Sequence, residues 1–235
     1  MAFVLEVTRW FGDRANWRGE TGLGNLVIEH LTVSAVAMAL AMVVALPLGL
    51  GLGHLGRGGV VAVNVANVGR AVPSFAVLVI ALQLSSIGTT PTVVALVALA
   101  VPPMVTNCWV GMRQVDADVR EAARGMGMTG RQLFRSVELP LALPVVMAGV
   151  RTAAVQVVAT ATLAALVGYG GLGELIVLGL RTGDDVEVFA GAATVAVLAL
   201  VTEVGLGLAQ RALTADPLRH RTFPGAPGEA VPRPA

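Results

Sequence analysis

The sequence predicts an all-α integral membrane protein with five transmembrane helices. Hydrophobic residues make up 55% of the 235 residues and charged residues 13%, and these proportions are typical of membrane proteins. Five apolar stretches each reach the roughly 20 residues that a helix needs to cross a bilayer. One long polar segment, residues 115–144, interrupts the apolar stretches. These observations predict a helical bundle with one large connection between spans.

The expected spans cover residues 28–53, 60–84, 91–112, 143–167 and 188–210. Together they form a membrane domain of residues 25–213. Residues 1–24 precede it, and their tryptophans and arginines indicate an amphipathic helix lying on the external membrane surface. A disordered lead-in is the alternative for this segment. Residues 214–235 are rich in Pro, Gly and Arg, which predicts a disordered cytoplasmic tail.

The rarer residue types exclude several functions. All sixteen basic residues are arginine. A phosphate-binding Walker loop needs a lysine, so the chain is not a conventional ATPase. Cys108 is the single cysteine, which excludes disulfides and cysteine metal clusters within one chain. His30, His54 and His220 lack metal-ligand spacing and are expected to be solvated or interfacial. No nucleophile–base pair suggests an enzyme, and a net charge of +1 does not suggest a nucleic-acid partner.

The polar segment 115–144 predicts two short helices joined by a bend. Asp118 and Glu121 have the spacing of a capping box, which marks a helix start. Thr129 and Gln132 repeat that spacing and open a second helix.

Glycine and proline mark the breaks in this segment. Gly125 and Gly127 weaken the first helix and permit a turn. Pro140 and Pro144 lack an amide donor and crowd the preceding turn, so they are expected to end or kink the second helix.

The segment resembles the EAA loop of permease subunits in binding-protein-dependent ABC importers. The resemblance is carried by Glu121-Ala122-Ala123, by Gly127 and by Leu139-Pro140. It implies the type I ABC importer permease fold, with the loop in the cytoplasm and docked on an ATP-hydrolysing subunit. The implied ATPase-coupling residues are Glu121, Ala122, Ala123, Gly125, Gly127, Leu139 and Pro140. A solvated amphipathic connector is the alternative interpretation.

The same resemblance implies partners. These are a pair of ATP-binding subunits, an external substrate-binding protein, and a second copy of the permease or a related one. The chain itself would hold no cofactor, because ATP and Mg²⁺ would bind to the ATPase subunits. The chain would be a multi-pass protein of the cell membrane.

Arginine counting gives an orientation. With the loop of residues 113–140 in the cytoplasm, ten arginines lie inside and four outside. This arrangement predicts an external N-terminus and a cytoplasmic C-terminus.

Residues 121–144, 148–152 and 160–168 are similar to permeases for quaternary-ammonium osmoprotectants. The implied cargo is glycine betaine, choline, carnitine or a proline-betaine-like compound. Tyr169 stands where a small residue is expected, and Arg70 stands where a glutamine is expected. An ABC permease for methionine or another amino acid is the alternative. A secondary transporter or channel is a more distant alternative. Such proteins usually show internal repeats, and the two halves of this sequence show no convincing repeat.

Aromatic cages hold quaternary ammonium ions. The spans offer four aromatic residues that are dispersed in the sequence, namely Phe75, Trp109, Tyr169 and Phe189. Selectivity is therefore expected to reside mainly in the external binding protein.

Candidate residues of the translocation path lie in and after the fourth span. Thr152, Gln156 and Thr160 recur every four residues and share one helix face. They are expected to face the path or to bond to a neighbouring helix. Gly170 and Gly171 open an external segment with a short helix over residues 172–180. The family resemblance suggests that these glycines lie near the path, and helix packing is an equal alternative.

Arg151 and Glu203 are ionisable residues within spans. Each lies about eight residues inside the cytoplasmic end of its span, so both are expected at one depth. A charge in hydrocarbon is costly unless it is paired or hydrated. We therefore expect an intramembrane ion pair with a structural role, and Arg70 is the competing partner.

Overall fold

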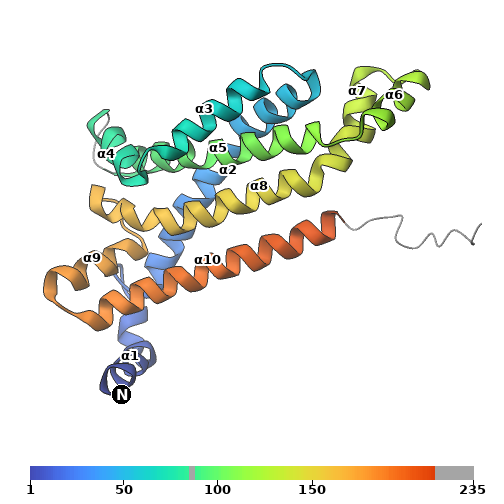
Figure 1. Cartoon of the computed structure of the whole chain (residues 1–235). Coiled ribbons are helices and arrows are strands. Elements are labelled where there is room, and N and C mark those ends of the chain that lie inside the picture. The colour runs from blue at the N-terminus through green and yellow to red at the C-terminus, as the bar shows by residue number, and fades with distance from the viewer. Residues whose placement is uncertain (85–87, 215–235) are drawn as a thin grey trace, which may run out of the picture.

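The computed structural model describes residues 1–84 and 88–214, and all elements in these ranges are helices (Figure 1). Four helices are long and apolar enough to cross a membrane: α2 (Leu23–Leu55), α5 (Thr89–Arg113), the run Gly130–Val167 and α10 (Asp185–Leu213). They confirm four of the five predicted spans. The run Gly130–Val167 consists of α7 (Gly130–Leu133), the π-helical turn η2 (Phe134–Glu138), α8 (Leu139–Thr160) and the 3₁₀ segment η3 (Ala161–Val167).

The remaining expected span, residues 60–84, is a bent pair of helices. Helix α3 (Gly59–Ala71) and helix α4 (Ser74–Leu84) meet at 90°. Pro73 separates them, and a residue before proline is pushed out of the helical region, as Val72 is with φ −73° and ψ 125°. The 13 residues of α3 are about 20 Å long, short of a hydrocarbon core of about 30 Å. The pair is therefore at most one broken span, and the described residues make four or five crossings.

The helices place the polar connection at one end of the bundle. Helix α6 (Ala117–Gly125), α7, the α2–α3 connection and the C-terminal end of α10 lie at this end, which we call the elbow end (Figure 1). Helix α4 and helix α9 (Leu172–Thr182) lie at the opposite, far end. The predicted short helix at 172–180 is therefore present, and it packs back along α10.

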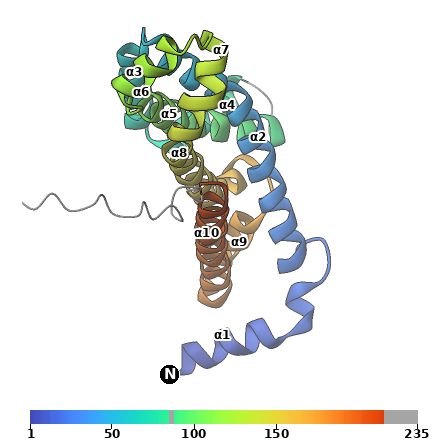
Figure 2. The ribbon, with the colours of Figure 1, turned by 90° about the vertical axis from the view of Figure 1, so that its right-hand side faces the viewer.

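The N-terminal helix α1 (Ala2–Gly12) lies across the far end of the bundle (Figure 2). Phe3 contacts Phe189 of α10 with ring centroids 5.5 Å apart, and Trp10 and Phe11 pack on a buried cluster of α2, α9 and α10 residues. A helix with this direction and these aromatic residues suits the interface of a membrane. Residues 215–235, most of the predicted tail, lie outside the described ranges.

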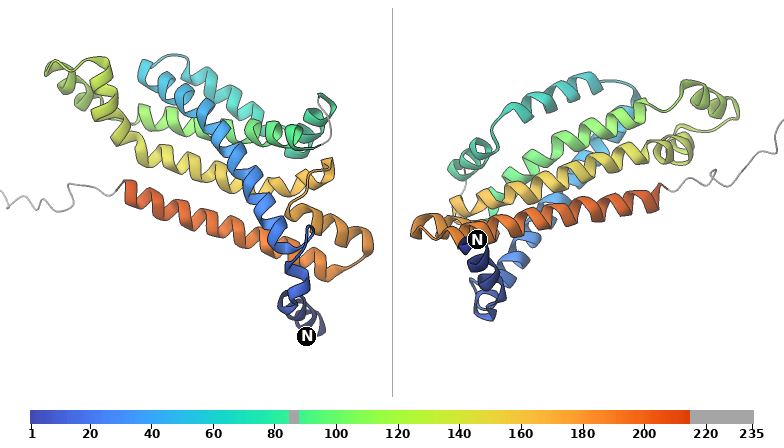
Figure 3. Two further views of the ribbon diagram at one scale, coloured as in Figure 1. Left: turned by 180° about the vertical axis from the view of Figure 1, so that it is seen from behind. Right: turned by 60° about the horizontal axis from the view of Figure 1, so that its bottom comes forward.

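Small residues hold α2 against α5. A stripe of α2 repeats every four residues and faces the core: Val33, Ala37, Ala41, Ala45, Gly49 and Gly53. A Cβ on Gly53 would lie 2.4 Å from the Cβ of Met112, and one on Gly49 would lie 2.6 Å from that of Cys108. Such close backbone approach is typical of membrane helix packing. Helix α5 packs in turn on α8, and α8 on α10 (Figure 3).

Candidate functional site

The predicted bend and second cap of the elbow are present. Gly127 has φ +83°, a left-handed conformation that glycine adopts at little cost. Its amide donates to the carbonyl of Arg124 at 2.9 Å. Thr129 and Gln132 form a reciprocal capping box at the start of α7. Two short helices joined by a turn therefore form the elbow, as the spacing predicts.

The start of α6 differs from the prediction. Asp116, and not Asp118, caps the helix, because its carboxylate accepts the Asp118 amide at 2.8 Å. Asp118 and Glu121 therefore lie inside the helix. Glu121 and Ala122 are exposed on α6, whereas Ala123 is buried. An exposed Glu-Ala pair beside the bend is available for contact with another chain.

The proline prediction was wrong about position. The helix continues through Pro140, in the first turn of α8, and through Pro144 within it. The irregularity lies one turn earlier, in the π-helical turn η2. Pro140 has no amide to donate to the carbonyl four residues before it, so the hydrogen-bond pattern changes there. Leu139 is half-buried and Pro140 is exposed.

A buried ionic cluster lies at the base of the elbow. Glu138, the last residue of η2, is 0% exposed. Its Oε2 lies 2.5 Å from His54 Nδ1, and its Oε1 lies 3.2 Å from Arg120 Nε. Arg120 also donates to the carbonyl of Met112. We call His54, Arg120 and Glu138 the elbow triad.

The histidine prediction was wrong for His30, which is buried, and His54 is partly exposed in the last turn of α2. His30 is 1% exposed, and its Nε2 lies 2.8 Å from the carbonyl oxygen of Val158. Val158 lies in the last turn of α8, next to the 3₁₀ segment η3, so the imidazole reaches a carbonyl near the end of the α-helix. The side chain of His54 is 28% exposed and belongs to the triad. His220 lies outside the described residues.

Local sequence patterns gave no signal for the triad. His54 and Glu138 are 84 residues apart. Helical periodicity relates residues within one element, whereas this contact depends on how α2 and η2 are packed. The one available sequence signal for the triad was Glu138, an acidic residue directly before the apolar start of α8.

The far end holds a second polar cluster. Glu29 accepts the amide of Gly171 at 3.0 Å and the Asn25 side-chain amide at 3.0 Å. Gly171 has φ +78°, and a Cβ on Gly170 would lie 2.4 Å from Glu29 Oε2. The close contact accounts for a glycine at 170, and the left-handed backbone accounts for one at 171. Burial and the neighbouring Glu29 raise the pKa of Tyr169 above its usual value.

A cavity of about 230 Å³ lies beside these glycines. Its lining includes Gly170, Tyr169, Glu174 and Arg181. The other path candidates do not line it. Thr152 is exposed, and Gln156 and Thr160 are half-buried on α8 beside the core-facing residues. The structure thus does not gather the five path candidates around one cavity.

Arg151 and Glu203 lie together. Arg151 Nε is 3.2 Å from Glu203 Oε1, and the two side chains are 33% and 45% exposed. The pair joins α8 to α10 and borders a cavity of about 210 Å³ that Arg211 also lines. The side chain of Arg70, the competing partner, lies outside the described part of the structure.

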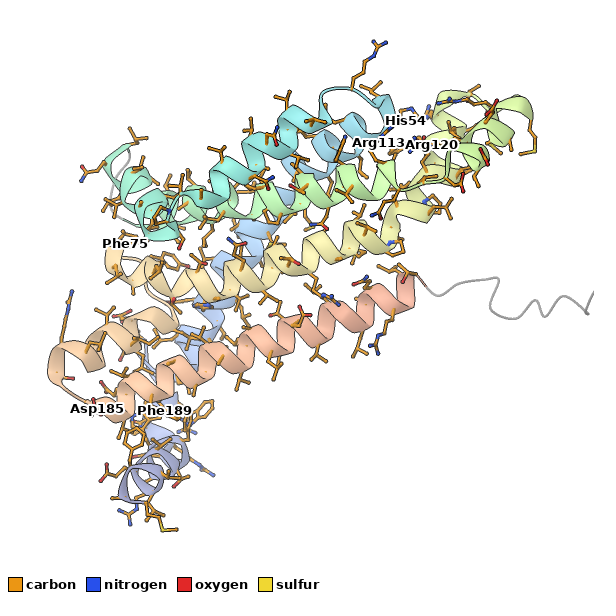
Figure 4. All side chains as sticks on the ribbon, viewed as in Figure 1. His54, Phe75, Arg113, Arg120, Asp185 and Phe189 are labelled. Carbon is orange, nitrogen blue, oxygen red and sulfur yellow. The ribbon has the colours of Figure 1, made fainter. Side chains whose placement is uncertain are left out.

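Aromatic residues of the spans do not converge. Phe75 and Phe189 lie well apart (Figure 4). Trp109 packs over Gly59 at the elbow end, whereas Tyr169 contacts Glu29 at the far end. These four residues therefore form no cage within one chain.

Long apolar helices on either side of a capped polar elbow define a membrane-spanning transport subunit. Residues 37–215 match the family described as "Binding-protein-dependent transport system inner membrane component", and the chain belongs to this family. The family is a membrane component of transport systems and not an enzyme, as the sequence predicts.

Two curated relatives and one solved structure illustrate the similarity. The Choline transport system permease protein OpuBB of Bacillus subtilis (strain 168) is 39% identical over 186 residues, which cover 79% of this chain and 86% of that protein. The Carnitine transport permease protein OpuCB of Listeria monocytogenes is 41% identical and covers 67% and 72%. A structure of inward facing conformations of the MetNI methionine ABC transporter matches with a TM-score of 0.71 and 25% identity, over 82% and 96%. The predicted type I importer permease fold is thereby confirmed.

Proposed function

We propose that this chain is the permease subunit of an ATP-driven importer of a quaternary-ammonium osmoprotectant. The cargo class is glycine betaine, choline, carnitine or a related compound, delivered by an external binding protein. Family membership supports the importer class. Relatives named for choline and carnitine transport support the cargo, because they match at 39% and 41% identity.

The elbow is the observation that carries the proposal. A pair of ATP-binding subunits, which hold the ATP and Mg²⁺, would each dock against the exposed face of one α6 in a pair of permeases. Glu121 and Ala122 are free for that contact, and Gly127 sets the bend beside them. The elbow then lies in the cytoplasm, with the N-terminus outside and the C-terminus inside.

Transport of this kind needs a moving scaffold and weak binding rather than a catalytic centre. Thr152, Gln156 and Thr160 supply neutral polar groups along one face of α8 for a passing solute. No aromatic cage forms from the span residues described above, so selectivity belongs to the binding protein.

Methionine import is the alternative within the class. Its support is the similarity to the structure of the MetNI methionine ABC transporter, which is 25% identical to this chain. The relatives named for quaternary amines are more similar to this chain, which favours the osmoprotectant class.

The test is uptake by proteoliposomes that contain the permease, its ATPase subunits and its binding protein. We expect ATP-dependent uptake of labelled glycine betaine, choline or carnitine, and little uptake of methionine. Uptake of methionine alone would refute the cargo class, and uptake without nucleotide would refute the importer class. Labelling of Glu121→Cys, in a Cys108→Ala background, with a membrane-impermeant thiol reagent tests the orientation. The cysteine should react only after the cells are opened.

A further inference from the structure

We propose that the elbow triad is a positioning unit that transmits movement of α6 to the membrane helices. This inference rests on the proposed function, because it requires that the ATPase moves α6. The triad would keep the direction of α6 fixed relative to α2, α5 and α8 during each ATP cycle.

The connections of the triad support this role. Each member comes from a different element: His54 from α2, Arg120 from α6 and Glu138 from η2. Arg120 adds a fourth element, because it also donates to the carbonyl of Met112 in the last turn of α5. Figure 4 shows His54 and Arg120 close together between the end of α2 and the elbow. One guanidinium and one carboxylate thus join four elements, α2, α5, α6 and η2.

Apolar packing holds α6 only weakly. Ala123 is the single buried residue among the nine residues of α6. A methyl group buries little apolar surface and fixes no direction. The Arg120 side chain is 12% exposed and the Glu138 side chain 0%. The polar contacts of α6 with the bundle are therefore mainly those of Arg120, namely its ion pair with Glu138 and its hydrogen bond to the Met112 carbonyl.

The π-helical turn places Glu138 for this contact. The turn ends at Glu138, immediately before the regular helix α8. A π turn adds a residue to the helix and rotates the helical residues after it, and such turns often occur at functional sites. In η2, Glu138 is the one residue described as buried, although it is charged. The irregular turn and the buried charge therefore occur together, at the junction between elbow and span.

A positioning role differs from a merely stabilising one. Removal of one member leaves a buried charge without its partner, which is destabilising, whereas apolar replacement of both members is often tolerated. If the pair only stabilises the fold, Arg120→Met with Glu138→Leu restores what either single change removes. If the pair transmits direction, the double variant is stable and still uncoupled, because apolar contacts do not fix the angle of α6.

The experiment uses the full complex of permease, ATPase and binding protein in proteoliposomes. Spin labels at Val43→Cys of α2 and Leu200→Cys of α10, in a Cys108→Ala background, report the distance between the helices with and without nucleotide. The variants are Arg120→Met, Glu138→Leu, His54→Ala and the Arg120→Met/Glu138→Leu double. Arg57→Met, an exposed arginine of the α2–α3 connection, is the control for loss of charge. Solute uptake per ATP hydrolysed is measured on the same samples.

We expect the nucleotide-dependent distance change to disappear in the double variant, although the ATPase subunits remain bound. Uptake per ATP should fall about fivefold or more, the size of a typical allosteric coupling. Arg57→Met should retain both the nucleotide-dependent distance change and the uptake per ATP. A double variant within about twofold of the unaltered chain in both measurements would overturn the proposal. If the unaltered chain shows the distance change but imports none of the quaternary amines, the cargo class fails and the positioning role stands. If it shows no distance change, the positioning role fails, and the solute uptake of the same samples decides the cargo class.

Discussion

Replacement of Glu203 by leucine would leave Arg151 without its ion partner inside the membrane. Glu203 lies ten residues before Leu213, the last residue of α10, which places it about 15 Å from that end and near the middle of a hydrocarbon core of about 30 Å. An unpaired arginine at that depth costs about 2.5–3.5 kcal/mol on the insertion scale. The cavity beside the pair admits some solvent, so we expect the lower value.

Thermal unfolding of the purified chain in detergent measures this cost. For a chain of this size, 1 kcal/mol shifts Tm by roughly 2–4 °C, so Glu203→Leu should lower Tm by about 5–10 °C. Glu20→Leu, at an exposed site before α2, is the control and should shift it little. Combining Arg151→Leu with Glu203→Leu should regain most of the loss.

Charge exchange gives the second measure. Arg151→Glu and Glu203→Arg should each reduce solute uptake strongly, because each places two like charges together. The double exchange restores an ion pair and should recover uptake. If both double variants are no better than the worse of their single variants, the pair does not stabilise the bundle as reasoned.

Three further predictions concern the elbow and the far end. Gly127→Val should leave the amount of protein in the membrane unchanged but lower uptake per ATP about tenfold, the equivalent of about 1.4 kcal/mol, because a β-branched residue resists φ +83°. The control Gly51→Ala, where the added Cβ meets nothing within 4 Å, should keep coupling, and equal uptake per ATP in both variants would contradict this. Thr129→Ala should cost about 1 kcal/mol of helix stability and speed amide exchange at Gln132, and unchanged exchange would speak against the cap. Gly173→Ala should destabilise the chain by about 1–3 kcal/mol in thermal unfolding, because its Cβ would lie 2.0 Å from the Thr162 carbonyl oxygen. The control Gly205→Ala should leave the Tm unchanged, because the added Cβ meets nothing within 4 Å. Equal Tm values for the two variants would refute the packing explanation.

The sequence predicts those features that depend on local chemistry. Long apolar runs specify the spans, and a cap with a left-handed glycine specifies the bend, since each depends on residues a few positions apart. The equal depths of Arg151 and Glu203 follow from helical rise along antiparallel spans.

Features that depend on packing between distant elements could not be predicted in this way. His54 meets Glu138 because the ends of α2 and η2 lie side by side, and His30 is buried where its ring reaches the Val158 carbonyl of α8. The right angle between α3 and α4 needed the direction of the chain after Pro73, which an apolar run does not encode. The path candidates on α8 and the glycines after it proved to lie in different surroundings.

The run Gly130–Val167 is longer than the hydrocarbon core of a membrane is thick. Its 38 residues extend over about 57 Å, nearly twice the thickness of the hydrocarbon core. A tilt of only about 5° about its midpoint would displace each tip by about 2.5 Å in opposite senses. A small push on the tip at the elbow end would thus displace the tip at the far end as well.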